Sequence, residues 1–176
     1  GIERMRAAGI EVVTDVLRDE CYAINEAFFT IQATRRPKVT LKWAQSADGY
    51  IDLLRDSGSA VRISTPVSQV AVHKLRACHD AIMVGRHTAL LDNPSLNIRH
   101  WAGHAPLRLV IDGKATLSPA LALFDGLQPT IVYTARAVEG KYGENVKQVE
   151  LDFDSDVLPQ ILDHLGSIGV NSLLVE

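Results

Sequence analysis

The sequence predicts an α/β domain built on a largely parallel sheet with helices on both faces. Short runs of consecutive apolar residues recur along the chain, at residues 81–84, 107–111 and 130–133, and such runs are typical of strands buried on both faces. Segments with helical spacing of apolar residues lie between them, and this alternation favours a parallel sheet. With 176 residues, 47% of them hydrophobic, the chain is large enough to bury such a core.

The composition excludes several classes of partner. The net charge is −3 and no basic run occurs, so we expect no nucleic-acid surface. No apolar run is long enough to span a bilayer, and the first residues are charged rather than signal-like. Cys21 and Cys78 lie far apart and form no disulfide framework. We therefore expect a cytoplasmic protein without a membrane partner.

The first 35 residues differ in pattern from the rest. Residues 1–8 are typical of the end of a helix capped by Gly9, residues 10–16 alternate like a strand, and residues 17–32 carry a helical apolar stripe. A helix and strand alone offer too little partner surface to be stable. We interpret residues 1–35 as the tail of a preceding domain with a connecting helix, and residues 36–176 as the main domain.

The main domain begins with a predicted strand at residues 39–44, followed by a loop whose most flexible point is residues 57–59. The next helix begins at Thr65-Pro66, because a hydroxyl cap followed by proline is a favoured helix start. From Val67 onward, apolar Val70, Ala71 and Leu75 indicate its buried stripe.

After the strand at residues 81–84, Gly85 leads into a short helix over residues 86–92, which Asn93-Pro94 ends. Strands follow at residues 107–112, 130–133 and 146–151. Acidic residues start a helix over residues 155–165, where negative charge suits the helix dipole. The last strand covers residues 172–175. The chain stops directly after it, so we expect the domain to be truncated at its C-terminus.

Polar or glycine residues stand within or after several predicted strands, where ligands of parallel sheets bind. They are Lys42, Asp48, Gly85, Gly113, Arg136 and Glu176. Near Gly85 in the sequence lie Arg76, Thr88, Asp92 and Arg99, and arginines fork readily onto phosphate oxygens. The pattern favours a nucleotide site, and the alternative is a set of ordinary surface arginines beside a helix cap.

Four segments carry a resemblance to a known family: LKWAQSADG (41–49), HKLRACHDAIMVGRHTALLDNPSLNIR (73–99), PLRLVIDG (106–113) and SLLVE (172–176). They resemble the reductase half of the bifunctional riboflavin-biosynthesis deaminase/reductases, and residues 1–17 resemble the end of the deaminase half. The resemblance implies a dihydrofolate-reductase-like fold, homodimerisation and NADPH-dependent reduction of 5-amino-6-(5-phosphoribosylamino)uracil. The hydride goes to C1′ of the ribose. The zinc motifs of the deaminase half are absent, so we expect no metal site in these residues.

The resemblance also implies roles for individual residues. Substrate contacts fall on Arg76, Leu96, Arg99 and Glu176, with both arginines at the phosphate. Cofactor contacts fall on Thr88 and Asp92, on the backbone of Ala44 and Gly113, and on Arg62, where the family often has other residues. Lys42 and Asp48 are the catalytic candidates, and which one assists proton transfer stays open. From its place after a strand, Arg136 is either a contact for the 2′-phosphate of the cofactor or a solvated arginine.

Two alternatives remain at this point. The chain is another dihydrofolate-reductase-like oxidoreductase, or a non-catalytic fragment that only dimerises. Arg76 and Arg99 favour a phosphorylated substrate over a folate. The family continues beyond the position of Glu176 with a glycine pair near the cofactor, so we expect weak NADPH binding by this stretch alone.

Overall fold

The computed structural model describes residues 1–54 and 60–176, so the predicted flexible point at residues 57–59 lies outside the described residues. Within them, six strands form one sheet in the order β1-β6-β2-β3-β4-β5, and every neighbouring pair is parallel. The strands are β1 (Lys38–Leu41), β2 (Ala81–Gly85), β3 (Leu107–Ile111), β4 (Thr130–Thr134), β5 (Val146–Glu150) and β6 (Ser172–Val175). The expected α/β architecture is therefore confirmed.

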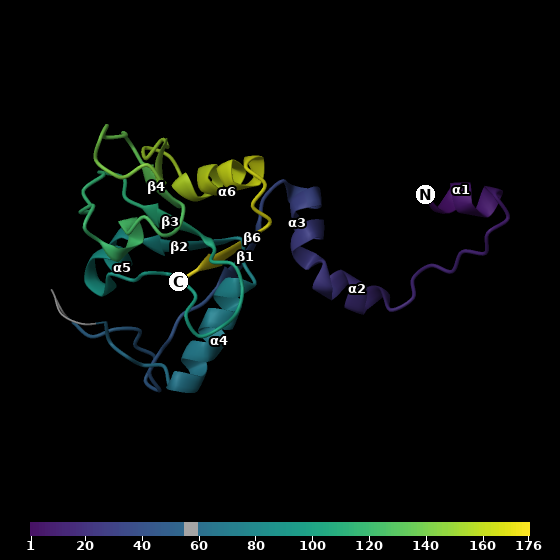
Figure 1. The fold of residues 1–176 in the computed structure, drawn as a ribbon, viewed down its shortest axis with the longest axis horizontal. Helices are drawn as coiled ribbons and strands as arrows, with labels where there is room; N and C mark the ends of the chain where they lie inside the picture. Colours follow the sequence, from purple (N-terminus) through teal and green to yellow (C-terminus); the bar gives the residue numbers. More distant parts are fainter. Residues whose placement is uncertain (55–59) are drawn as a thin grey trace.

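Helices cover both faces of this sheet (Figure 1). The helices of the described residues are α1 (Ile2–Ala7), α2 (Arg18–Ile24), α3 (Glu26–Thr34), α4 (Pro66–Ala77), α5 (Arg86–Asp92) and α6 (Val157–Ser167), with a 3-10 turn, η1 (Ala122–Phe124). Helix α6 lies on one face, and α4 and α5 lie on the other. Among the described residues, no helix combines the length and the apolar character needed to cross a bilayer.

The strand β2 shows why these residues form a doubly covered sheet. Successive side chains of a strand point to opposite faces. Ala81 and Met83 therefore pack with Ile161 of α6, whereas Ile82 and Val84 pack with Ala89 of α5 in the second core. Because both faces are buried, the run is apolar throughout rather than alternating.

Local signals at several helix ends act as predicted. The Thr65 hydroxyl accepts a hydrogen bond from the Ser68 amide at 3.2 Å, and Pro66 occupies the first position of α4. Helix α5 ends at Asn93, which adopts a left-handed conformation that asparagine tolerates. The Asp156 carboxylate caps α6 by accepting from the Leu158 amide at 3.1 Å.

The N-terminal expectations are partly wrong. Residues 10–16 form no strand, since no other strand pairs with them, and the predicted helix over residues 17–32 is two helices. The break is at Asn25, whose side-chain amide donates to the Cys21 carbonyl at 2.9 Å and so competes with the helix ladder. Ile31 is the buried residue of α3, and α1 and α2 extend away from the sheet (Figure 1).

The predicted apolar stripe of α4 also needs correction. Val67 is 80% exposed and Val70 is 40% exposed, whereas His73 is buried and Leu75 packs against the second core. The first strand ends at Leu41 rather than at residue 44. Helix α4 therefore buries a histidine, and this side chain accepts a hydrogen bond from the loop between α5 and β3.

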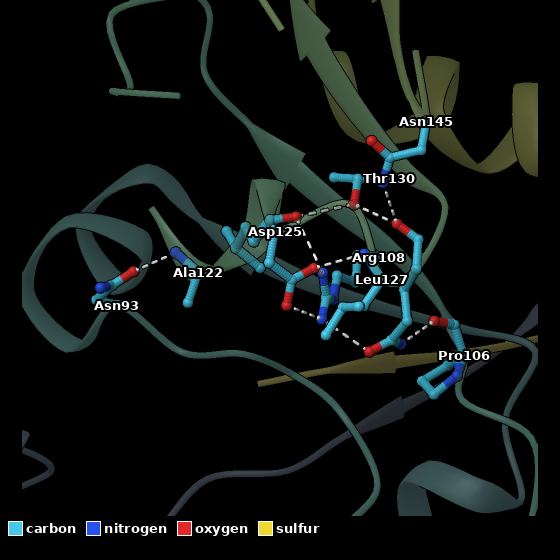
Figure 2. Close-up of polar contacts among 10 residues, drawn as sticks. Asn93, Pro106, Arg108, Ala122, Asp125, Leu127, Thr130 and Asn145 are labelled. Atoms are coloured by element: carbon cyan, nitrogen blue, oxygen red, sulfur yellow. Dashed lines mark hydrogen bonds and ion pairs between the residues drawn. The ribbon is translucent and has the colours of Figure 1, made fainter. Parts of the chain in front are cut away.

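A charged network stabilises the end of the sheet opposite the strand tips (Figure 2). Arg108, fully buried near the start of β3, donates to the Asp125 carboxylate at 2.7 and 3.3 Å and to the Gln128 side chain at 2.8 Å. It also donates to the Leu123 carbonyl at 3.1 Å. These bonds hold the turn at η1 against the sheet, and the Arg108 hydrogen bond holds the pKa of Asp125 below its usual value.

Asp125→Ala is expected to lower the free energy of unfolding by about 3 kcal/mol, because it leaves a buried guanidinium without its anion. Denaturant unfolding measures the change. The matched control is Asp163→Ala, which breaks a fork with Arg36 that is largely exposed to solvent and should matter little. Equal losses in both variants would contradict a structural role specific to the Arg108 network.

Candidate functional site

The tips of β1 and β6 bring two charged residues together. The Lys42 amide donates to the Val175 carbonyl at 2.9 Å, and the Glu176 amide donates to the Met83 carbonyl at 3.0 Å. Each residue is thus fixed by a backbone bond to the neighbouring strand just beyond the end of its own. The Lys42 ammonium lies 3.7 Å from the Glu176 carboxylate.

Arg76 of α4 forms the stronger contact with the same carboxylate. Its Nε and Nη2 donate to the two Glu176 oxygens at 3.1 and 2.8 Å, and its Nη1 donates to the Asn97 carbonyl at 3.3 Å. The two charged side chains are only 13% and 11% exposed. A guanidinium has five N–H donors, so the contacts with described residues leave two for a ligand.

The loop between α5 and β3 lies along α4. Besides the Arg76–Asn97 bond, the Arg99 amide donates to His73 Nδ1 at 3.1 Å, and the Lys74 ammonium lies 5.1 Å from the centre of the Trp101 ring. Further along, a side chain on Gly103 would reach within 2.9 Å of Ala77, so the glycine permits the close approach. Helix α4 therefore sets the path of this loop.

Leu96 lies at the start of this path, in a conformation that leucine rarely adopts. Its φ is +48°, and its side chain is buried in the second core. Left-handed backbone of this kind costs about 1–2 kcal/mol, and such strain clusters at functional sites. Since the side chain is in the core, only the backbone of Leu96 remains for a ligand.

The two arginines predicted to bind phosphate lie in one neighbourhood. His73 is within electrostatic reach of both, because Arg76 and Arg99 each lower its pKa, after burial as the largest cause. The Arg99 side chain is exposed, and within the described part of the chain it makes no hydrogen bond or ion pair. Arg99 is therefore the freer of the two cations, and Arg76 is shared with Glu176.

The predicted cofactor residues lie mainly at the tips of β2, β3 and β4. Thr88 and Asp92 lie on α5, directly after β2, and both are half-buried. Arg136 follows β4 and is exposed, with its backbone bonded to the Thr134 hydroxyl. Ala44 follows β1 and is half-buried, while Arg62 is exposed in the loop before α4.

Gly113 follows β3, where its backbone is expected to contact the cofactor. In the structure, its lack of a side chain serves packing inside the domain. A Cβ at this position would lie 2.7 Å from the Phe153 ring. Its carbonyl accepts from the Ala135 amide at 2.9 Å and from the Thr134 hydroxyl at 3.2 Å. The glycine thus permits packing of the β5–α6 loop, while its position at the strand tip is as expected.

Asp48 is separate from the Lys42–Glu176–Arg76 cluster. Its carboxylate accepts a short hydrogen bond from the Ser46 hydroxyl in the turn after β1. It lines an open hollow of about 740 Å³ together with Tyr50, Ile63 and other residues of the same loop. Of the two catalytic candidates, Lys42 is the one that the described contacts join to the other predicted site residues.

Sequence reasoning missed three polar residues around this site. His73 supports the loop, Asn97 has a buried side-chain oxygen without a described partner, and buried Asp112 accepts from the Leu117 amide at 2.7 Å to shape the turn after β3. Asp112 stands directly after an apolar run, a visible signal. His73 and Asn97 act through contacts between distant segments, for which the sequence carries no local signal.

The charges of the site suit a phosphorylated polyol. Lys42, Arg76 and Glu176 together leave one excess positive charge, and Arg99 adds a second nearby. Guanidinium groups bind phosphate oxygens in a fork, and a carboxylate accepts hydrogen bonds from hydroxyl groups. The guanidinium groups of Arg76 and Arg99 therefore form a candidate anion-binding site, called here the anion grip, beside the Glu176 carboxylate at the strand tips.

Glu176→Gln is expected to lower the free energy of unfolding by about 1–2 kcal/mol, because two poorly hydrated cations then lose their shared anion. Thermal or denaturant unfolding measures the loss. Glu26→Gln is the matched control, since its ion pair with Lys38 is far more exposed. A loss no larger than in the control would contradict the role of Glu176 as the centre of the cluster.

Comparison with known proteins gives consistent matches. Residues 37–176 match the family described as the RibD C-terminal domain. The riboflavin biosynthesis proteins RibD of Bacillus amyloliquefaciens and Aquifex aeolicus are each 33% identical over the whole of this chain. The chain spans about half the length of these curated relatives, 49% and 50% respectively.

Solved structures agree. A Thermotoga maritima diaminohydroxyphosphoribosylaminopyrimidine deaminase/5-amino-6-(5-phosphoribosylamino)uracil reductase superposes with a TM-score of 0.89 at 34% identity, covering 99% of this chain and 48% of that one. The Saccharomyces cerevisiae riboflavin biosynthesis reductase Rib7 shares the fold, with a TM-score of 0.60 at 24% identity over 87% of this chain and 71% of its own. The expected dihydrofolate-reductase-like fold is confirmed, and the chain belongs to the RibD C-terminal domain family.

Proposed function

We propose that this chain carries the reductase step of riboflavin biosynthesis, the NADPH-dependent reduction of 5-amino-6-(5-phosphoribosylamino)uracil to its ribityl form. The observation that carries the proposal is the cluster of Lys42, Arg76 and Glu176 at the strand tips, with the guanidinium of Arg99 nearby, unpaired among the described residues. Family membership supports the same reaction, since the Thermotoga relative bears the name of this reductase.

Substrate binding is assigned to the β6 side of the site. Arg99 and the two spare N–H groups of Arg76 bind the phosphate, and the backbone of Leu96 lies against the substrate. The Glu176 carboxylate accepts hydrogen bonds from sugar hydroxyls. This binding contributes to catalysis by fixing the position of C1′, because orientation of the reactants removes much of the barrier.

NADPH, when bound, supplies a hydride that forms the new C–H bond at C1′ while the C1′–O4′ bond breaks and O4′ takes up a proton. Lys42 is the favoured source of that proton, because its ammonium lies beside Glu176 whereas Asp48 lies in a separate loop. Asp48 is assigned to shaping the hollow after β1.

Cofactor binding is assigned mainly to the tips of β2, β3 and β4, with Ala44 after β1 and Arg62 in the loop before α4 as further contacts. The donor set fits a phosphorylated dinucleotide, because Arg62 and Arg136 are exposed cations and Thr88 offers a hydroxyl on α5. Asp92 and the backbone of Ala44 and Gly113 complete the set. Arg136 is the candidate for the 2′-phosphate that distinguishes NADPH from NADH.

The whole protein is proposed to be a cytoplasmic homodimer with a deaminase half. Residues 1–35 are assigned to the end of that half and residues 36–176 to the reductase half, since the similarity to the bifunctional relatives covers the entire chain. Zinc is expected only in the deaminase half.

Arg99→Ala is expected to raise KM for the phosphorylated substrate at least tenfold and to leave KM for NADPH within about twofold, because a charged hydrogen bond to phosphate contributes about 1.5–3 kcal/mol. NADPH oxidation at 340 nm measures both. The control is Arg4→Ala, an exposed arginine of α1. Turnover of dihydrofolate in place of the phosphorylated substrate would contradict the proposed function.

Lys42→Met is expected to lower kcat about a hundredfold or more with a smaller effect on KM, since removal of a general acid typically costs 10²–10⁴. Asp48→Asn should lower kcat much less. Steady-state kinetics of the two variants decide between the candidates. A larger loss in Asp48→Asn would transfer the proton-transfer role to Asp48.

A further inference from the structure

A buried histidine of α4 supports the backbone of the phosphate-binding loop. His73 is 4% exposed, and its Nδ1 accepts a hydrogen bond from the Arg99 amide at 3.1 Å. An imidazole nitrogen that accepts from an amide carries no proton, so the neutral ring must carry its hydrogen on Nε2. The hydrogen bond from the Arg99 amide thus fixes the tautomer of His73.

The surroundings of His73 favour its neutral form. Arg76 faces it from its own helix, Arg99 and His100 face it from the loop, and Glu176 faces it from the tip of β6. The His100 ring lies edge-on at 4.8 Å between centroids. Burial and then Arg76, His100 and Arg99 lower the pKa of His73, while Glu176 opposes them.

We propose that His73 is a positioning residue that holds Arg99 in place for the substrate phosphate through its Nδ1 acceptor, and that protonation of this nitrogen releases the loop. This proposal rests on the proposed function for its kinetic consequence. The contacts of the loop with α4 at Asn97 and Trp101 lie on either side of Arg99 and involve no imidazole. His100 of the loop packs on the His73 ring, so the test below compares variants that keep His100 and change only His73.

The direction of the pH effect follows from the lowered pKa. Above the ordinary histidine pKa of 6.5 the ring is neutral in both the folded and unfolded chain, and the full contribution of the hydrogen bond is present. As the pH falls below 6.5, the unfolded chain takes up the proton first, and stability declines. The loop is released when the pH falls through the lower pKa of the folded state.

The test compares two substitutions of His73. In His73→Asn the amide oxygen stands near the position of Nδ1, so an acceptor remains but cannot titrate, whereas His73→Ala has none. His73→Ala should raise KM for the phosphorylated substrate about five- to tenfold with little change in kcat or in KM for NADPH, since one hydrogen bond contributes about 1 kcal/mol. His73→Asn should stay within about twofold of the original.

The control is His79→Ala. His79 lies just after α4 and also uses both ring nitrogens, at 2.7 Å to the Leu75 carbonyl and 2.9 Å to the Thr40 hydroxyl, but it faces β1 rather than the loop. Its loss should lower stability without raising KM for the substrate. A similar rise in KM in both variants would overturn the proposal in favour of a general packing role.

The pH profile separates the histidine from the substrate. The substrate phosphate itself titrates near pH 6, so KM should rise in acid for every variant. The original chain should show an additional rise below pH 6.5 that His73→Asn lacks. Identical profiles for the original chain and His73→Asn would overturn the pH-sensitive part of the proposal.

A ligand-free measurement keeps the inference independent of the reaction. In ¹⁵N NMR of the chain alone, the His73 ring should be the Nε2–H tautomer at pH 7.5, and the Arg99 amide should be protected from hydrogen exchange. Protection should fall in acid, persist in His73→Asn and vanish in His73→Ala. Absence of turnover by the whole protein would reject the proposed function alone. A protonated Nδ1 at pH 7.5, or an unprotected Arg99 amide, would reject the role of His73 even if His73→Ala does not fold.

Discussion

The candidate site depends on one carboxylate. Glu176 lies just past the end of β6, where its backbone amide donates a hydrogen bond to the Met83 carbonyl. Its carboxylate forms a bidentate ion pair with Arg76. An arginine so fixed can then donate to the Asn97 carbonyl, which ties the loop between α5 and β3 to α4. Without that anion, Lys42 and Arg76 would repel each other at a poorly hydrated edge of the sheet. The anion grip is therefore built around an internal ion pair.

Two arginine–carboxylate contacts at opposite ends of the sheet have different consequences. Arg108 and Asp125 close the end at which the strands begin, where the guanidinium is fully buried and both of its terminal nitrogens donate to protein groups. Arg76 and Glu176 lie at the tips, slightly exposed, with donors to spare. The same chemistry thus stabilises one end of the domain and leaves the other able to bind a ligand, as expected for parallel sheets.

The sequence predicts the fold well, because buried parallel strands are continuous apolar runs and helix ends carry local caps, such as Thr65-Pro66 and Asp156. It fails where tertiary contacts decide. Residues 10–16 alternate but find no strand to pair with, and α4 buries His73 instead of Val70 because a loop 26 residues later needs an acceptor. The strand-tip residues follow from topology alone, whereas the pairing of Arg76 with Glu176, 100 residues apart, has no local signature.

The central claim is that the anion grip lies where α4 and its loop meet the tip of β6. The most direct measurement is an NMR titration of the chain with ribose 5-phosphate, following the guanidinium and amide resonances of all arginines. We expect saturable shifts at Arg99 and Arg76, and much weaker shifts with unphosphorylated ribose. Shifts confined to arginines elsewhere, such as Arg36 beside α6, or equal shifts with both sugars, would contradict this account.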